Sequence, residues 1–139
     1  NTAITYLNLI ITPSSSSSKI LLFGRLFCEP CTTDAQNSGV FFLRDSTKIN
    51  AHNVSDAGSR NNMLQSLPSN YTSHDANSTP ETFGIFTVDS PSSSSQINYK
   101  IGYINSQNNT LHVNRTVAAT NSANYEAGSS EIIAMEIAG

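Results

Sequence analysis

A chain of 139 residues is long enough for one domain whose hydrophobic core needs no disulfide or metal to hold it. Charged residues make up only 12% and the net charge is −3, so no basic stripe is present that could neutralise the phosphates of nucleic acid. The longest apolar run, Lys19–Cys28, is far shorter than the roughly 18 residues of a membrane span, so we expect no membrane insertion.

Hydroxyl and amide side chains take the place of charge at the surface, because Ser and Thr together number 35 and Asn numbers 16. Six Phe and five Tyr supply core material, and the low net charge argues against disorder. We therefore expect one folded domain over residues 1–139. The chain begins at Asn1 without an initiator Met or a signal-peptide pattern, which indicates a processed product or the C-terminal part of a longer protein.

Strand-like runs dominate and are separated by clusters of Ser, Asn, Pro and Gly, a pattern typical of an all-β sandwich or barrel. In chain order the expected strands are Ala3–Thr12, Lys19–Cys28, Gly39–Asp45, Thr47–Asn53, Thr82–Asp89, Ile97–Asn105, Thr110–Arg115 and Glu131–Ala138. The tracts Ser14–Ser18 and Ser92–Ser95 each follow a proline and are expected to be loops. The best helix candidate, Asn61–Leu67, is marginal at seven residues.

Two of these strands are apolar on both faces. In Lys19–Cys28 one face carries Ile20, Leu22, Leu26 and Cys28, and the other carries Leu21, Phe23 and Phe27. In Glu131–Ala138 one face carries Ile133, Met135 and Ile137, and the other carries Ile132 and Ala134. An antiparallel sheet with one wet face should alternate cleanly between apolar and polar residues. Either the strand lies centrally in the domain, or one face packs the core and the other meets a second subunit; for the last strand, assembly is the better explanation.

No pattern in the chain indicates catalysis, a cofactor or a metal. Cys28 and Cys31 form a single C-x-x-C pair at the end of a strand, without the βαβ context of a redox motif or the second pair of a zinc site. A local disulfide or two free thiols are the expected states. The histidines, His52, His74 and His112, show no ligand spacing, and neither a G-x-S-x-G motif nor an acid–base pair of carboxylates is recognisable. We expect a protein that is not an enzyme.

Several segments, taken in order, resemble a domain that recurs in bacteriophage structural and fibre proteins. They are Ile11–Leu21 (ITPSSSSSKIL), 83–91 (FGIFTVDSP), 97–100 (INYK), 114–116 (NRT) and Ser129–Ile137 (SSEIIAMEI). The resemblance spans about residues 4–138, with roughly 52–80 unmatched. It implies an antiparallel jelly-roll β-sandwich of the C1q/TNF-like kind that forms a homotrimer. The positions that carry over are structural ones: Asp89, Tyr99, Asn114, Arg115, Met135, Glu136 and Ile137.

The resemblance implies a virion structural protein on the exterior of the particle, a fibre, knob or capsid decoration whose partners are itself, other virion proteins and a host surface glycan or receptor. The alternative is a secreted, extracellular C1q/TNF-like ligand or a lectin-like carbohydrate-binding module. Candidate structural and trimer-interface residues are Tyr99, Arg115, Ile133, Met135, Glu136 and Ile137.

Two finer expectations concern the last strand and the loops. Glu136 lies between Met135 and Ile137, so we expect a buried carboxylate paired with Arg115 or, failing that, with Lys100. Surface recognition is expected in the polar loops around Ser55–Thr79 and Asn105–Asn109, because loops on a rigid β scaffold commonly carry binding.

Overall fold

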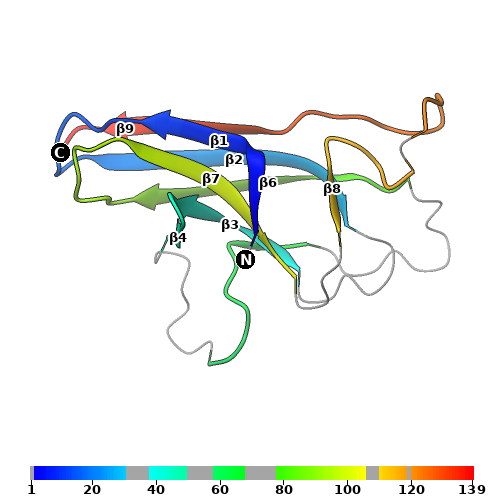
Figure 1. Cartoon of the computed structure of the whole chain (residues 1–139), viewed down its shortest axis with the longest axis horizontal. Coiled ribbons are helices and arrows are strands. Elements are labelled where there is room, and N and C mark those ends of the chain that lie inside the picture. Colours follow the sequence, from blue (N-terminus) through cyan, green and yellow to red (C-terminus); the bar gives the residue numbers. More distant parts are fainter. Residues whose placement is uncertain (1, 31–37, 50–57, 68–77, 106–109, 119) are drawn as a thin grey trace.

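The computed structural model describes residues 2–30, 38–49, 58–67, 78–105, 110–118 and 120–139. Over these ranges the chain is all-β and consists of two antiparallel sheets (Figure 1). The strands are β1 (Thr2–Ile11), β2 (Lys19–Pro30), β3 (Gly39–Arg44), β4 (Thr47–Lys48), β5 (Gln65–Ser66), β6 (Glu81–Asp89), β7 (Ile97–Ile104), β8 (Leu111–Val113) and β9 (Glu131–Ile137). No described segment is a helix long and apolar enough to cross a bilayer.

The first sheet, sheet A, has the order β1-β7-β3-β4, and β5 also pairs with β3. Its first pair, β1 with β7, contains a register shift between Ala3 and Asn8, which marks a bulge or irregularity in the edge strand. The tight connection from β3 to β4 places Asp45 at a φ of 55°, a left-handed conformation that Asp tolerates better than most residues. The Asp45 carboxylate also accepts a hydrogen bond from the Asn98 amide at 3.0 Å, so the turn is fixed to β7.

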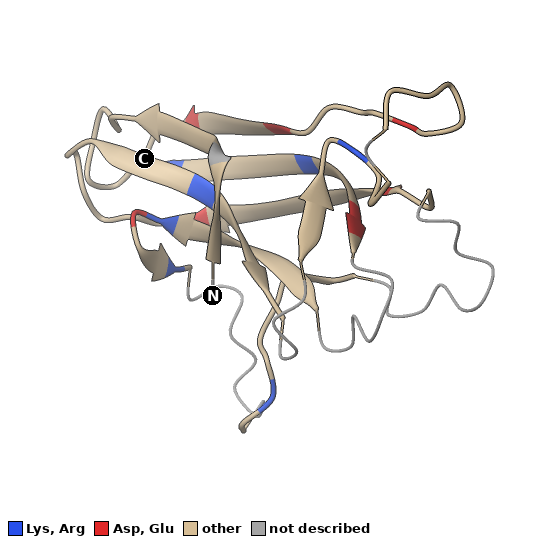
Figure 2. Ribbon diagram, turned by 45° about the vertical axis from the view of Figure 1, so that its right-hand side comes forward, with Lys and Arg blue, Asp and Glu red and all other residues tan. Residues whose placement is uncertain are grey.

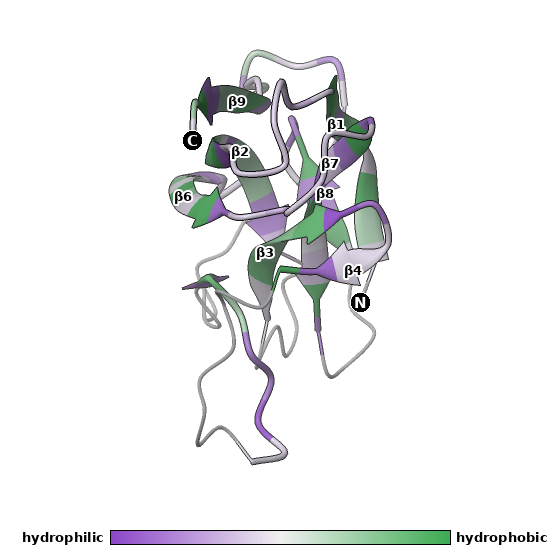
Figure 3. Ribbon diagram, turned by 90° about the vertical axis from the view of Figure 1, so that its left-hand side faces the viewer, coloured by the Kyte–Doolittle hydropathy of each residue, from purple (hydrophilic) through white to green (hydrophobic). Residues whose placement is uncertain are grey.

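The second sheet, sheet B, is built around β2. Strand β6 pairs along nearly the whole of one side of β2, from Ile20 opposite Asp89 to Cys28 opposite Glu81. On the other side, β9 pairs with the first half of β2 and β8 with its last three residues. In the end-on view of Figure 3, β9, β2 and β6 form one layer and β1, β7 and β3 the other.

The core lies between the two sheets and is filled by the inward-facing residues of both. From sheet B come Ile20, Leu22, Leu26, Cys28 and Ile85, and from sheet A come Ile4, Leu7, Val40, Phe42, Ile97, Tyr99, Ile101 and Tyr103. The inner face of β2 is the one that the alternation predicts, and its four apolar side chains are fully buried. The two sheets therefore form a β-sandwich, and the prediction of an all-β fold is confirmed.

Most expected strands form within one or two residues of their predicted ends, with two exceptions. The fourth is shorter than expected, because β4 covers only Thr47–Lys48 and residues 50–53 lie outside the described part of the chain. The helix candidate Asn61–Leu67 is wrong: this segment contains the short strand β5, and the Leu64 and Leu67 amides donate to carbonyls of Val40 and Ser38. Pairing with the edge of β3 outweighs a helical pattern too short to nucleate a helix alone.

Candidate assembly face

The outward side of sheet B carries an unusual number of apolar side chains. Along β2, the residues that alternate with the core positions are Lys19, Leu21, Phe23, Arg25 and Phe27. Phe23 is 39% exposed although it lies on the central strand of the sheet. A large aromatic side chain in that position is normally covered by another layer of the protein.

Strand register brings the apolar residues of the neighbouring strands into the same rows. Phe23 lies between Phe86 of β6 and Ile133 of β9. The next row places Leu21 between Val88 and Met135, and Ile137 lies opposite Lys19 beyond it. The rings of Phe23 and Phe86 are 6.4 Å apart between centroids and tilted by 33°, a favourable aromatic geometry. We call this set of residues the apolar face: Leu21, Phe23, Phe86, Val88, Ile133, Met135 and Ile137.

The exposed area of the apolar face is comparable with the apolar part of a protein–protein interface. Phe86 is 69% exposed, and the other members with large exposure lie between 39% and 48%. With full side-chain areas of roughly 150–250 Å² each, these six side chains expose roughly 500 Å² of apolar surface. That is close to the non-polar share of a standard interface, which buries about 800 Å² per partner of which about 60% is non-polar. The largest apolar patch on a typical monomer is of similar size and is often functional.

Charged groups bound the apolar face at both ends. Lys19 lies at one end, and at the other the Arg25 guanidinium pairs with the Glu131 carboxylate, with Nε and Oε1 2.9 Å apart. Arg25 also donates to the Ser129 hydroxyl at 3.1 Å. Figure 2 shows how sparsely charge is distributed over the strands, as single charged residues separated by long uncharged stretches. An apolar centre with a polar rim is the arrangement found in protein–protein interfaces.

The outward side of sheet A has a different character. Its β7 row includes Asn98 and Lys100, and the Lys100 ammonium donates to the Asp45 carbonyl at 2.9 Å. Phe41 points outward too but is fully buried, with the Lys48 ammonium 4.7 Å from its ring centroid. Desolvation in this position lowers the pKa of Lys48. Among the described residues of sheet A, Ile10 is the large hydrophobic side chain left widely exposed, at 57%.

Of the interface candidates that the sequence singled out, three lie together on the apolar face. They are Ile133, Met135 and Ile137, and each is nearly half exposed. Sequence reasoning placed them on one face of the last strand and Ile132 and Ala134 on the other, and both placements hold, since the latter two pack against the core. Figure 3 shows the hydrophobic colouring of β9 at the margin of the molecule.

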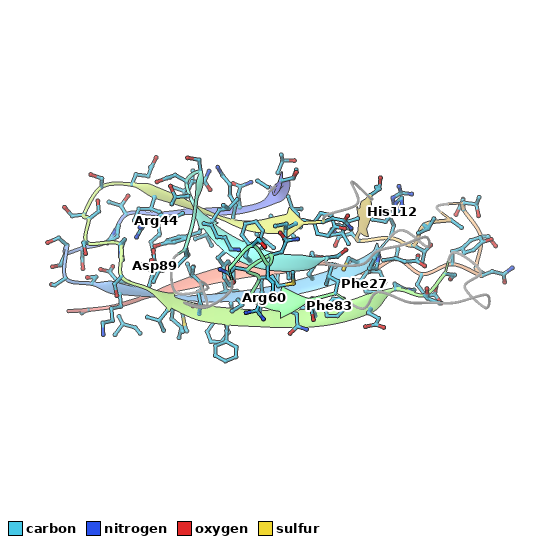
Figure 4. The ribbon with its side chains drawn as sticks, turned by 90° about the horizontal axis from the view of Figure 1, so that it is seen from below. Phe27, Arg44, Arg60, Phe83, Asp89 and His112 are labelled. Carbon is cyan, nitrogen blue, oxygen red and sulfur yellow. The ribbon has the colours of Figure 1, made fainter. Side chains whose placement is uncertain are left out.

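Tyr99 is not part of this face. It is fully buried between the sheets, where its hydroxyl donates to the Asp89 carboxylate at 2.6 Å, and Asp89 also accepts two bonds of 3.2 Å from Nη1 of Arg44. Figure 4 shows Arg44 and Asp89 together at one end of the sandwich. Burial, and then the hydrogen bond to Asp89, raise the pKa of the Tyr99 phenol far above its usual value. Tyr99 thus joins sheet A to sheet B within one copy, which fits the structural role expected of it, and its part in a trimer interface stays a prediction.

Glu136 is held differently from the way the sequence suggested. Its side chain points toward the β1–β2 loop, where Oε1 accepts hydrogen bonds from the Ser14 hydroxyl at 2.6 Å and the Ser14 amide at 2.7 Å. These bonds lower the pKa of the carboxyl group. The expected partner Arg115 is an exposed residue just after β8, and Lys100 donates to Asp45 instead. The expectation of a buried ion pair is therefore wrong, because a solvent-accessible carboxylate is satisfied by hydroxyl and amide donors alone.

The opposite end of the sandwich contains a second buried carboxylate, Glu29 of β2. It is fully buried and accepts hydrogen bonds from the amide and hydroxyl of Thr79 and from the Val117 amide, at 2.5–2.9 Å. It therefore fixes two loops to the sheet. Opposite it on β8 lies His112, whose pKa is lowered by burial and by the charge of Arg115. As the sequence indicated, His112 lies on the other face of β8 from Leu111 and Val113, which pack against the core. Figure 4 shows His112 at this end.

Cys28 is a buried free thiol in the core, and its burial raises its pKa to about 12. Cys31, the expected partner of a local disulfide, lies outside the described residues, as do His52, His74 and residues 55–57, 68–77 and 106–109 of the predicted recognition loops. The described parts of those loops are 58–67, 78–79 and residue 105. Among the described residues, no three His, Cys, Asp or Glu side chains cluster in a way that could hold a metal ion.

Sequence reasoning missed the contribution of β6 to the apolar face. Phe86 and Val88 were taken only as part of a strand, although Phe83 and Ile85 alternate with them and face the core or its margin. The signal that could have found them is the run FGIFTVD, which is apolar at consecutive positions in the same way as the last strand. The chain matches no protein-family model and no curated protein.

Proposed function

We propose that this chain is a structural protein of a virus particle: a C1q/TNF-like jelly roll that forms a homotrimer and is displayed on the particle's exterior as a fibre, knob or capsid decoration. The observation that carries the proposal is the apolar face of sheet B. Because burying roughly 500 Å² of apolar surface is favourable, we expect a second and a third copy to cover it. A protein that binds further copies of itself through its most apolar surface is suited to assembly.

The order of strand pairing supports the jelly-roll assignment. Strand β1 pairs with β7, β2 with β6 and β3 with β4, so the pairs are nested around the connection from β3 to β4. Strands β1, β2 and β3 also alternate between the sheets, since β1 and β3 belong to sheet A and β2 to sheet B, and so do β6 of sheet B and β7 of sheet A. A long antiparallel hairpin folded over into two sheets produces this nesting, and that is how a jelly roll is arranged.

The interior chemistry supports a structural role over an enzymatic one. Asp89 and Glu29 are the buried carboxylates of the described chain, and they lie at opposite ends of sheet B, since Asp89 pairs with Ile20 near the start of β2 and Glu29 lies near its end. Each uses its oxygens to hold strands or loops of the same chain in place. Carboxylates that act as a general acid and base instead converge on one substrate position.

The contact with the host is proposed to lie in the hydroxyl- and amide-rich loops at 55–79 and 105–109. Such groups hydrogen-bond sugars and polar protein surfaces without placing a charge in a desolvated site. The secreted lectin-like alternative uses the same loop chemistry, so the loops do not separate the two functions. The location of the protein separates the two functions.

Oligomeric state is the direct test of assembly through the apolar face. We expect sedimentation equilibrium of the purified protein to give three times the chain mass of 14.9 kDa. Met135→Lys, which puts a charge in the centre of the face, should produce a folded monomer. Ile10→Lys is the matched control, because Ile10 is as exposed but lies on sheet A, and it should leave the trimer intact. A wild-type protein that sediments as a monomer at high concentration contradicts the proposal.

Location separates the virion protein from the secreted module. We expect antibodies against the folded domain to label intact virus particles, and labelling to be lost when the domain is removed from the particle gene. Secretion of the protein by uninfected cells, without any association with particles, would instead favour the lectin-like or ligand role.

A further inference from the structure

The described glycines that lie in strands are explained by their neighbours, with one exception. At Gly24 a Cβ atom would lie 2.8 Å from the Cδ1 of Ile101, and at Gly102 it would lie 2.5 Å from the ring of Phe41. Gly39 is likewise crowded by Met63. Each of these positions lacks room for a larger residue, so the fold of a single copy accounts for the glycine.

At Gly84, by contrast, nothing within one copy explains why the residue is a glycine. It lies in the middle of the nine-residue strand β6, its φ is not in the left-handed region, and a Cβ atom added to it meets nothing within 4 Å. Glycine weakens a strand interior, and there it often marks a bulge, a tight bend, or a place where a ligand or another backbone approaches closely. The register of β6 with β2 is unbroken at Gly84, which excludes a bulge. The missing side chain therefore points to a contact outside the single copy.

The position of Gly84 on the sheet indicates what approaches it. Gly84 lies opposite Arg25 and shares the outward side of β6 with Phe86 and Val88. It thus leaves a notch in the apolar face directly beside Phe86, whose side chain is the most exposed of the large hydrophobic side chains in the described chain. The ring of Phe86 thus projects from β6. Two residues away on the same strand, Gly84 leaves an empty site above the bare backbone.

We propose that the Phe86 ring of one copy packs into the notch over Gly84 of the next copy, an inference that rests on the proposed assembly. A second copy is the occupant because the same face supplies both the ring and the notch, so each copy can give one contact and receive one, as a closed symmetric oligomer requires. The rim agrees with this, since Arg25 lies opposite Gly84 and pairs with Glu131 on the far side of β2, so that both signs of charge bound this end of the apolar face. The apolar area also matches one side of a standard interface.

Filling the notch tests the inference. Gly84→Val places a β-branched side chain on the exposed side of a strand, where a single copy has space for it and where β-branched residues are favoured. We expect the variant to fold at least as stably at high dilution, while the concentration at which the trimer half-dissociates rises by roughly tenfold or more. Thr82→Val is the matched control, because Thr82 is an exposed residue on the same side of the same strand, and it should leave that concentration unchanged.

Two further variants complete the experiment. Phe86→Ala should weaken the trimer as Gly84→Val does, and the double variant should weaken it by less than the product of the two single effects, because both remove one contact. Gly84→Ala decides the outcome if the valine variant does not fold, with a weakening of several-fold expected. A wild-type monomer overturns both the assembly and this inference. A wild-type trimer that keeps its affinity in Gly84→Val overturns only the inference.

Discussion

Asp89 shows how single residues hold the sandwich closed. It belongs to sheet B, and both of its partners, Arg44 and Tyr99, belong to sheet A. A carboxylate with 6% of its side chain exposed is unfavourable unless charged or polar donors surround it. Sequence alone could not pair these residues, because their contact depends on how β3, β6 and β7 are stacked. The mistaken pairing of Glu136 with Arg115 has the same origin: the donor that the structure provides, Ser14, carries no charge to suggest it.

Removing the Tyr99 hydroxyl should be costly because it leaves a buried carboxylate with one donor fewer. We expect Tyr99→Phe to lower the free energy of unfolding by about 1–3 kcal/mol in urea titrations. The raised pKa of Tyr99 adds a pH test: the unfolded chain releases this proton above its ordinary value of 10.0 while the folded one retains it, so stability should fall as the pH rises past that value. The fall should be shallower in the variant.

Tyr125→Phe is the control for this experiment. Tyr125 lies in the segment between β8 and β9 and is not part of the core cluster. Removal of this hydroxyl should change the unfolding free energy by less than about 0.5 kcal/mol in either direction, which is the range for surface substitutions. Equal losses from the two variants would show that Asp89 does not depend on Tyr99.

At the scale of elements, the spacing of apolar residues along each strand predicted more of the structure than the identity of single residues did. The alternation in β2 and β9 assigned the inner and outer faces correctly, because a strand's side chains follow a strict period of two. It did not predict which strands are neighbours. Pairing of β2 with β6 and β9 joins segments about 60 and 115 residues apart, and nothing local in the sequence records such a choice. The apolar face could therefore be recognised strand by strand but not as one surface.

The contact between the β1–β2 loop and β9 can be tested as a unit. We expect Ser14→Ala and Glu136→Gln each to lower Tm slightly, and the double variant to lower it by less than the sum, because both break the same hydrogen bonds. The lowered pKa of Glu136 means that its contribution is present above its ordinary value of 4.5 and is lost as the pH falls through the lower value of the folded state. Arg115→Ala should leave this pH dependence unchanged, and a strong effect of Arg115 would restore the ion pair that the sequence suggested.

At the scale of the whole molecule, the two outer surfaces of the sandwich differ. Sheet A presents amides and lysines to the outside, whereas sheet B presents the apolar face. In the proposed trimer, sheet A thus faces solvent and sheet B the other copies. The stability of each folded chain then depends on assembly, because the copies that cover the apolar face bind only to folded chains.

We therefore expect Tm to rise with protein concentration. The rise should be clear over a hundredfold range in differential scanning calorimetry, since binding of a folded partner stabilises the folded state by mass action. Met135→Lys should have a Tm that does not change with concentration, and Ile10→Lys should behave like the wild type. A wild-type Tm that is constant over that range would show that the apolar face is not covered by other copies.

The central place of β2 in sheet B also determines when the domain can be completed on the ribosome. Lys19 and Arg25 pair with Ile137 and Glu131, which are synthesised more than 100 residues later. Until β9 emerges, the first half of β2 has an open edge, and Leu22 and Ile20 lack the neighbours on that side that cover them in the finished sandwich. An unpaired apolar strand is the kind of segment that joins other nascent chains. Ribosomes that translate this message side by side would thus hold incomplete copies at high local concentration, and prompt synthesis of β9 would favour correct folding over aggregation.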